Sequence, residues 1–207
     1  MTHASRGPRA ILLCAGASSR LGEPKALAEL GGQSVLARLL TAARAVDREP
    51  LVITGRDHAV IAAAARDLGC LAIRNERWAE GRTGSVLTGS AARAGEDLLV
   101  MPADVPLVTG DTVRALASSW LEAGAPPRGW LAPRVVDRGG RVLFGHPVLI
   151  GRDLCAHELP GLPPDAGLKT LRGLAEPLLS REVTDAAILD DLDTPADLEA
   201  LRARFRG

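Results

Sequence analysis

The sequence predicts a single α/β domain with a mostly parallel sheet, helices on both faces and an inserted β-hairpin region. Over the first 125 residues, short apolar segments typical of strands alternate with segments of helical periodicity. Such alternation is typical of a parallel sheet covered on both sides. Beyond residue 125, two strand-like segments flank a turn with two glycines, which indicates a hairpin. We find no internal repeat or long linker, so we expect one domain over residues 1–207.

Each element of the first part has a local signal. The expected strands are short apolar runs that stop at a glycine, a proline or a polar residue: Ala10–Cys14, Leu51–Thr54, Leu71–Arg74 and Leu98–Met101. The expected helices have apolar residues at helical spacing, and three of them have a capping residue or a stop glycine: Val35–Ala43 after Ser34, His58–Leu68 before Gly69, Ser85–Ala94, and Thr112–Ala123 after Asp111.

The later elements are less regular. Leu131–Val136 and Arg141–Phe144 flank the turn of the hairpin, and His146–Ile150 is a further candidate strand. Residues 158–173 are rich in proline and glycine, and we assign no element to them. A final helix is expected over Thr194–Arg204, with a proline in its first turn.

Composition excludes several classes of function. Lys plus Arg equals Asp plus Glu at 25 each, so the formal net charge is zero, which argues against a general nucleic-acid or membrane binder. Aromatic residues make up only 2% and Tyr is absent, so base-stacking surfaces are not expected. No apolar run approaches the roughly 20 residues that span a bilayer. We therefore expect neither nucleic-acid nor membrane partners.

The three cysteines, Cys14, Cys70 and Cys155, are scattered along the chain, which suits a reducing compartment and predicts a cytoplasmic protein. One alternative is that Arg6 and Arg9 before the apolar run form a short secretory signal. The run is very short for that role, so we favour a buried strand.

The segment after the first expected strand is a candidate anion site. Ligands of open α/β sheets bind beyond the carboxyl ends of strands. Gly16 allows a close approach of the backbone, and Arg20 and Lys25 bring two cations to the same loop. The loop matches neither of the common phosphate-binding patterns. The alternative is a surface turn with two solvated cations.

Carboxylates form the second candidate site. Asp104 follows an apolar strand and lies between two prolines, where a carboxylate is well placed to hold Mg²⁺; the alternative is a turn-forming aspartate. A further acidic cluster, Asp190, Asp191 and Asp193, precedes Thr194. Its alternative is simple capping of the last helix at Thr194.

Six segments together carry a family resemblance. Leu13–Lys25 resembles the signature of nucleotidyltransferases with a glycosyltransferase-A-like fold, and it fits best with the molybdenum cofactor cytidylyltransferase branch. The other segments resemble that branch in order along the chain: Asn75–Gly81 with Ser85, Pro102–Pro106, Gly145–Pro147, Asp165–Lys169 and Asp191–Pro195. The resemblance implies a three-layer, Rossmann-like nucleotidyltransferase fold, with a nucleotide-binding half over residues 10–125 and an acceptor-binding half over residues 126–200.

The resemblance also implies an activity and its residues. It implies a Mg²⁺-dependent CTP:molybdopterin cytidylyltransferase that transfers CMP to a phosphate acceptor, with release of pyrophosphate. The implied nucleotide-binding residues are Ala15, Gly16, Ala17, Ser18, Arg20, Lys25, Asn75, Gly81 and Ser85. The implied acceptor-binding residues are Gly145, His146, Pro147, Asp165, Gly167 and Lys169. The implied catalytic residues are Arg20, Lys25 and Asp104, and the implied metal ligands are Asp104 and Asp193, with Asp191 as the fallback.

Three positions refine this picture. Ala15 stands where guanylyl-transferring relatives have Gly, which favours CTP, whereas Arg82 stands where Met is common and Lys169 where Arg is usual. The partners implied are a nucleoside triphosphate, a phosphorylated acceptor such as molybdopterin, and transiently a molybdoenzyme or its chaperone. The alternatives are transfer to a sugar phosphate or another phosphorylated small molecule, or a non-catalytic nucleotide or cofactor carrier.

Overall fold

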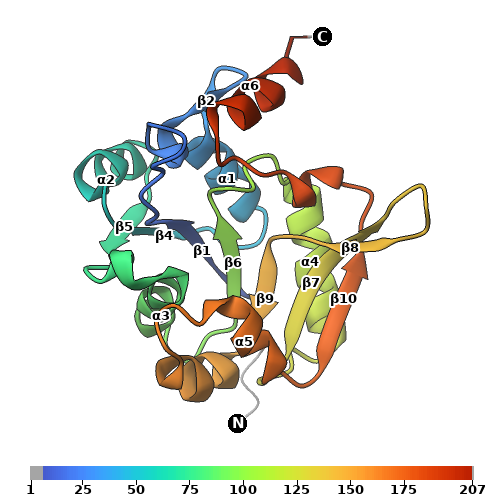
Figure 1. Ribbon diagram of the computed structural model, residues 1–207. Coiled ribbons are helices and arrows are strands. Elements are labelled where there is room, and N and C mark those ends of the chain that lie inside the picture. The colour runs from blue at the N-terminus through green and yellow to red at the C-terminus, as the bar shows by residue number, and fades with distance from the viewer. Residues whose placement is uncertain (1–6, 207) are drawn as a thin grey trace.

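A twisted central sheet carries helices on both faces in the computed structural model, which describes residues 7–206 (Figure 1). The eight-stranded sheet has the order β10-β7-β9-β6-β1-β4-β5, and β8 pairs with β7. Its strands are β1 (Arg9–Cys14), β4 (Leu51–Thr54), β5 (Leu71–Arg74), β6 (Leu98–Pro102), β7 (Trp130–Val136), β8 (Val142–Phe144), β9 (Val148–Ile150) and β10 (Leu178–Glu182). A separate two-stranded ribbon consists of β2 (Glu29–Leu30) and β3 (Gln33–Ser34).

The strand β1 lies at the centre of the parallel part of the sheet. It pairs in parallel with both β4 and β6, and its residues 10–14 are buried. A parallel strand covered on both faces reads as a continuous apolar run. This placement confirms the buried-strand interpretation of residues 10–14.

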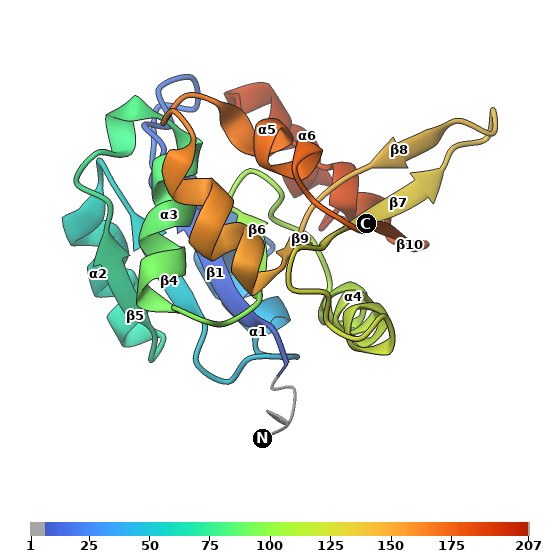
Figure 2. The same ribbon diagram turned by 90° about the horizontal axis from the view of Figure 1, so that it is seen from below.

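Helices cover the two faces of the sheet and make three layers. On one face, side chains of Ala10, Leu12 and Cys14 join a core with α1 (Val35–Ala43), α2 (His58–Asp67), α4 (Gly110–Glu122) and α6 (Pro195–Ala203). On the other face, Ile11 and Leu13 join a core with α3 (Arg82–Ala92) and α5 (Gly167–Gly173), as the view in Figure 2 shows. The alternation along β1 follows from the two-residue repeat of a strand. The predicted three-layer fold is confirmed.

The strand β9 runs antiparallel between β6 and β7. Because β9 is reversed, the chain enters it at the edge of the sheet where β6 ends. The predicted hairpin is confirmed as β7 and β8, and its turn is held by Asp137 Oδ1, which accepts hydrogen bonds from the amides of Gly139 and Arg141 at 2.8 and 2.9 Å. The candidate strand at His146–Ile150 begins only at Val148.

Several expectations need correction. The helix α3 begins at Arg82 rather than Ser85, and the cap of α4 is Thr109, whose hydroxyl accepts from the amide of Thr112, rather than Asp111. Asp111 instead lies in the first helical turn. The proline- and glycine-rich segment contains the short helix α5. The strand β10 was not expected, because most of it is exposed and it pairs only with β7 along its length.

The last helix, α6, begins with a reciprocal capping box. The Thr194 hydroxyl accepts from the amide of Asp197, and the Asp197 carboxylate accepts from the amide of Thr194 at 2.7 Å. Such boxes fix the entry of the chain into a helix. Within residues 7–206, no helix is both long and apolar enough to cross a membrane.

Candidate active site

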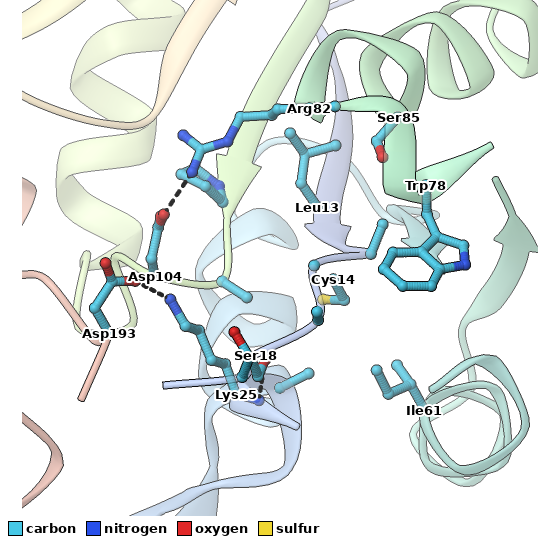
Figure 3. Close-up of a pocket in the computed structure, with 18 of the residues that line it drawn as sticks. Leu13, Cys14, Ser18, Lys25, Ile61, Trp78, Arg82, Ser85, Asp104 and Asp193 are labelled. Atoms are coloured by element: carbon cyan, nitrogen blue, oxygen red, sulfur yellow. Dashed lines mark hydrogen bonds and ion pairs between the residues drawn. The ribbon is translucent and has the colours of Figure 1, made fainter. Parts of the chain in front are cut away.

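A cavity of about 380 Å³ lies at the carboxyl ends of β1 and β6 (Figure 3). Its walls come from the loop after β1, the start of α3, the residues after β6 and the segment before α6. This is the edge of an open α/β sheet where ligands are expected. Eight of the predicted nucleotide-binding residues line it: Ala15, Gly16, Ala17, Ser18, Arg20, Lys25, Gly81 and Ser85.

The loop after β1 is folded on itself by hydrogen bonds around Ser18. The Ser18 carbonyl accepts from the amides of Leu21 and Gly22, and its hydroxyl accepts from the amide of Lys25 at 3.2 Å. This arrangement fixes the backbone at Lys25, whose side chain lines the cavity. Gly16 is exposed, and no other atom lies within 4 Å of where a Cβ would stand. The loop therefore presents open backbone to the cavity.

Gly55, just after β4, leaves space for two parts of the cavity wall, the loop after β1 and Trp78. A Cβ at this position would lie 2.3 Å from the carbonyl oxygen of Ala15 and 2.6 Å from Cβ of Trp78. Both distances are far below van der Waals contact. The absence of a side chain at Gly55 therefore lets Trp78 pack close to the loop after β1, and the Trp78 ring lines the cavity.

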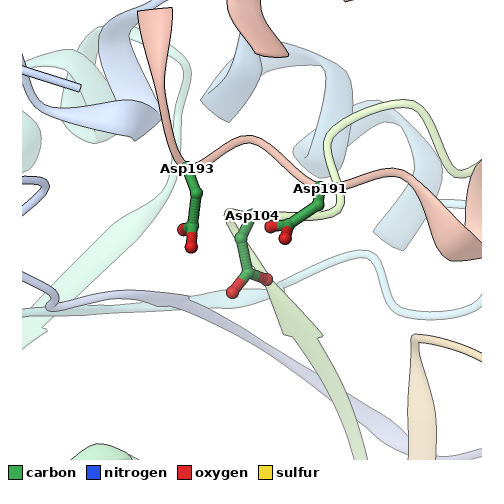
Figure 4. Close-up of side chains that lie close together, drawn as sticks. All are labelled: Asp104, Asp191 and Asp193. Carbon is green, nitrogen blue, oxygen red and sulfur yellow. The ribbon is translucent and has the colours of Figure 1, made fainter. Parts of the chain in front are cut away.

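Three carboxylates meet at one point of the site (Figure 4). Asp104, Asp191 and Asp193 each offer one oxygen, and these oxygens all lie within 4.8 Å of one another. The convergence has a backbone cause, because the amide of the fully buried Leu192 donates to the carbonyl oxygen of Asp104 at 2.9 Å. This bond brings the two aspartates that flank Leu192 to Asp104.

The acidic cluster fits a divalent cation. Hard oxygen ligands are those that Mg²⁺ prefers. Asp104 Oδ1 is buried and has no hydrogen-bond partner among the described residues, so this oxygen is available to a metal. Partial burial, together with the charges of Asp193 and Asp104, raises the pKa of Asp191. A bound cation would relieve that repulsion.

Cationic side chains also reach the acidic cluster. Lys25 Nζ and the Arg20 guanidinium both pair with the Asp193 carboxylate. The hydrogen bond from Lys25 lowers the pKa of Asp193. Arg82, at the start of α3, donates to Asp104 Oδ2 at 2.8 Å. The predicted cations and metal ligands are thus brought together, and Arg82 joins them.

Asn75 lies just behind the cavity wall rather than on it. It is buried, and its Nδ2 donates to the hydroxyl of Ser85 at 3.0 Å, while its Oδ1 accepts from the amide of Arg77 at 3.0 Å. The geometry makes Asn75 a residue that positions Ser85. Direct contact of Asn75 with a nucleotide remains a prediction.

The predicted acceptor residues do not line the cavity. Gly145, His146 and Pro147 lie near it. Gly145 packs so tightly that a Cβ would stand 2.1 Å from the carbonyl oxygen of Ile188. His146 is largely buried, and this burial lowers its pKa, while the charge of Asp104 acts in the opposite direction. A cis peptide bond joins His146 to Pro147. This segment enters β9 beside the carboxylate site.

The backbone at the start of the second predicted acceptor segment, Asp165–Lys169, packs against Gly81. A Cβ on Gly81 would stand 2.2 Å from the carbonyl oxygen of Pro164 and 3.1 Å from Cα of Asp165. Gly167 begins α5, and the side chains of Asp165 and Lys169 are exposed. The structure thus brings only the backbone near Asp165 to the rim of the cavity, and acceptor binding by these residues remains a prediction.

Ten lining residues were not among the predicted site residues, and three of them bear on the chemistry of the cavity. Arg82 and Trp78 line the cavity, and their signals were a cation three residues before a predicted helix and a rare aromatic residue in a chain with 2% aromatics. Cys14 also lines it, but burial raises the pKa of its thiol to about 12. Cys14 therefore stays protonated near neutral pH and is no nucleophile there.

Fold and site together define a nucleotide-binding α/β enzyme of the nucleotidyltransferase class. The chain belongs to the family of MobA-like NTP transferase domains, which matches residues 10–181. It is 30% identical over 151 residues to the bifunctional protein GlmU of Gluconobacter oxydans, a match that covers 70% of this chain and 33% of that protein. It is also 30% identical over 128 residues to the molybdenum cofactor guanylyltransferase of Ectopseudomonas mendocina, which covers 61% of each chain. The chain thus spans about a third of the GlmU protein that it matches.

Solved structures show the same fold. A nucleotidyl transferase from Methanothermobacter thermautotroptrophicus superposes with a TM-score of 0.75 at 23% identity, over 97% of this chain and 98% of that one. Rv0371c from Mycobacterium tuberculosis superposes with a TM-score of 0.72 at 26% identity, over 95% and 98% of the two chains. A further structure of Rv0371c, in complex with manganese, gives a TM-score of 0.71 at 23% identity, over 97% of this chain and 100% of that one.

Proposed function

We propose that this chain is a Mg²⁺-dependent cytidylyltransferase that transfers CMP from CTP to a phosphorylated acceptor such as molybdopterin, with release of pyrophosphate. One observation carries the proposal: two carboxylates that line the cavity at the carboxyl ends of β1 and β6, Asp104 and Asp193, converge with a third, and three cationic side chains that line the same cavity pair with them. Carboxylates can bind a metal ion and cationic side chains can bind phosphates, so together they can hold a metal-bound triphosphate. The relative that is a molybdenum cofactor guanylyltransferase supports the choice of acceptor.

The metal ligands proposed are Asp104 and Asp193, with Asp191 as the fallback. The free oxygen of Asp104 and the close approach of the three carboxylates support this assignment, as does the fold neighbour in complex with manganese. A bound Mg²⁺ supplies neutralisation and polarisation of phosphate oxygens.

Charge stabilisation and positioning are the roles proposed for this chain's own residues. An oxygen of the acceptor phosphate attacks the α-phosphorus of CTP, the bond from that phosphorus to the bridging oxygen breaks, and pyrophosphate leaves. Lys25 and Arg20 would release Asp193 and bind the triphosphate, whose negative charge they offset in the transition state. Because a phosphate oxygen is already a nucleophile, no side chain is needed as a general base. The loop after β1 would hold the nucleotide through its exposed backbone at Gly16.

Preference for CTP is proposed from Ala15, which is buried and lines the cavity. Its methyl group would disfavour the larger purine ring, and the segment from Asn75 to Ser85 would contact the base and ribose. A second candidate is guanylyl transfer, because the chain is 30% identical to a guanylyltransferase. The two candidates share the metal site and differ only in the base.

The acceptor side of the proposal rests on Gly145–Pro147 and Asp165–Lys169, which would face the acceptor at the rim of the cavity. Delivery of the product would involve a transient contact with a molybdoenzyme or its chaperone. The three cysteines are all free, which supports a reducing compartment such as the cytoplasm.

Pyrophosphate release from purified protein tests the proposal. Each of the four nucleoside triphosphates is supplied with molybdopterin, with and without Mg²⁺, and parallel reactions replace molybdopterin with a sugar phosphate. We expect turnover with CTP and molybdopterin that stops when EDTA removes the metal. Turnover with GTP and molybdopterin, but not with CTP and molybdopterin, would move the assignment to guanylyl transfer. Binding of nucleotide without pyrophosphate release from any pair would contradict transferase activity and favour a carrier.

A further inference from the structure

Arg82 forms an ion pair with Asp104, one of the proposed metal ligands. Its guanidinium donates to Asp104 Oδ2 at 2.8 Å, while Oδ1 of the same carboxylate is buried and unpaired. Lys25 and Arg20 meanwhile occupy Asp193. In the nucleotide-free protein, both proposed metal ligands are therefore neutralised by side chains of the chain itself.

The backbone of Arg82 is fixed, whereas its side chain is free to move. Arg82 is the first residue of α3, and Gly81 before it has a φ of 139° and is wedged against Pro164. The side chain is 49% exposed, and within residues 7–206 it makes a single hydrogen bond, the one to Asp104. Rotation of the side chain thus costs little, and because Arg82 lines the cavity, a guanidinium that leaves Asp104 stays beside any ligand there.

We propose that Arg82 occupies Asp104 in the nucleotide-free protein and transfers to the phosphate oxygens when the metal–nucleotide complex binds. The inference rests on the metal site of the proposed function. Its consequence is coupled binding: the protein takes up the metal with the nucleotide in preference to the free metal.

Charge balance supports the exchange. Three carboxylates face three cationic side chains, so their formal charges cancel. A free divalent cation would add positive charge to a site that is already neutralised, beside the guanidinium that is bound to Oδ2 of Asp104. A metal–triphosphate complex brings net negative charge, and its oxygens give the displaced guanidinium a matching, bidentate partner.

The test compares Arg82→Met with wild type and with Arg128→Met. Arg128 is a matched control, because its side chain is 45% exposed, against 49% for Arg82, and its ion pair at 2.9 Å is with Glu158, which lies outside the acidic cluster. Binding of Mn²⁺ is measured by electron paramagnetic resonance, first to the protein alone and then with CTP but no acceptor, so that no CTP is consumed. Thermal melts check that each variant is folded.

We expect two changes of opposite sign for Arg82→Met. Free Mn²⁺ should bind about three- to fivefold more tightly, the scale of a half-exposed ion pair, and Mn²⁺ with CTP should bind more weakly by a similar factor. Arg128→Met should change neither affinity. A merely structural role for Arg82 would weaken both.

Other results would overturn the inference in distinguishable ways. If free Mn²⁺ binds Arg82→Met no more tightly than wild type, Arg82 does not compete for Asp104 and the inference is wrong, while the proposed metal site stands. If neither protein binds Mn²⁺, with or without CTP, the metal site of the proposed function fails, and the inference fails with it. The variant Arg82→Gln repeats the comparison if Arg82→Met does not fold.

Discussion

Asp104 is the residue on which the metal assignment depends most directly. We predict that Asp104→Ala abolishes Mg²⁺-dependent turnover and leaves the fold intact, because the side chain is a carboxylate at the end of a strand and not a core group. Pyrophosphate release and a thermal melt measure the two properties. A variant that unfolds, or that keeps near-normal activity, would show that Asp104 has a different role.

Lys25 and Arg20 are expected to act on the phosphates. Lys25→Ala should lower kcat by roughly 10²–10³, as for the loss of one preorganised charge-stabilising donor. Arg20→Lys should also reduce kcat/KM, since a single ammonium cannot reproduce the bidentate contact of a guanidinium. Steady-state kinetics with CTP measure both, and an Arg20→Lys enzyme identical to wild type would remove Arg20 from the site.

Ala15 is expected to set the preference for the base. One apolar group typically discriminates by about 10–200-fold in kcat/KM, so CTP should be preferred over GTP clearly but incompletely. Ala15→Gly should narrow the ratio without reversing it, because polar contacts to cytosine would come from the segment Asn75–Ser85. Competition between CTP and GTP measures the ratio. Equal use of both nucleotides by wild type would refute the cytidylyl assignment and leave nucleotidyl transfer standing.

The sequence allowed the residues of the site to be predicted better than their pairings. The loop residues and the carboxylates stand next to strands and caps that have clear local signals, so Lys25, Asp104 and Asp193 could be expected at one edge. Arg82 could not, because its partner Asp104 is 22 residues away and nothing in the local pattern fixes the direction of an exposed arginine. Trp78 depends in the same way on the space left by the distant Gly55.

At the scale of elements, the capping box of α6 connects stability with the metal site. The Asp197 carboxylate accepts from the amides of both Thr194 and Asp193, so the start of the helix also fixes the backbone of a proposed ligand. We therefore expect that a weaker box, which holds the Asp197 carboxylate less firmly, also loosens Asp193.

We predict that Thr194→Ala destabilises the fold by about 1 kcal/mol, a typical value for a lost helix cap. For a chain of this size that corresponds to a fall in Tm of about 2–4 °C. The variant should also bind Mn²⁺ more weakly. Thr109→Ala removes the cap of α4, which lies outside the acidic cluster, and is the control: a similar fall in Tm is expected, with unchanged metal affinity. Equal metal affinities of the two variants would contradict the coupling.

The two larger elements that were not predicted, β10 and α5, bury almost no side chain. The run at 10–14 and the helix at 35–43 contribute to the two cores, which explains their regular patterns. The strand β10 has no buried residue and is recognisable only through its pairing with β7, while α5 buries a single leucine, Leu171. Their positions are set by tertiary contacts that no local pattern records.

At the scale of the whole molecule, the acidic cluster that would bind a metal lowers the stability of the metal-free protein. Burial and the neighbouring carboxylates raise the pKa of Asp191, so its ionised form is less favourable in the folded protein than in the unfolded one. The unfolded chain therefore loses the proton first as pH rises, and Asp191 lowers stability above the unfolded pKa of about 4.

We predict that Asp191→Asn raises Tm at pH 7 by roughly 1 °C, a small effect because the side chain is exposed. The difference in Tm between variant and wild type should fade as pH falls towards 3, where the side chain at position 191 is neutral in both proteins. Added Mn²⁺ should raise the Tm of wild type more than that of the variant. Melts at several pH values, with and without Mn²⁺, measure this, and a variant less stable than wild type at pH 7 would contradict it.

The pairing of Lys25 with Asp193 joins residues 168 positions apart in the chain. The strands β1, β4 and β6 all precede residue 103, so during synthesis they can assemble before Asp191 and Asp193 have emerged. The acidic cluster is then completed only by the segment that precedes α6. If the proposed metal site is right, a nascent chain that has already folded the loop after β1 should hold no metal until its last helix docks, which makes metal uptake a marker of finished folding.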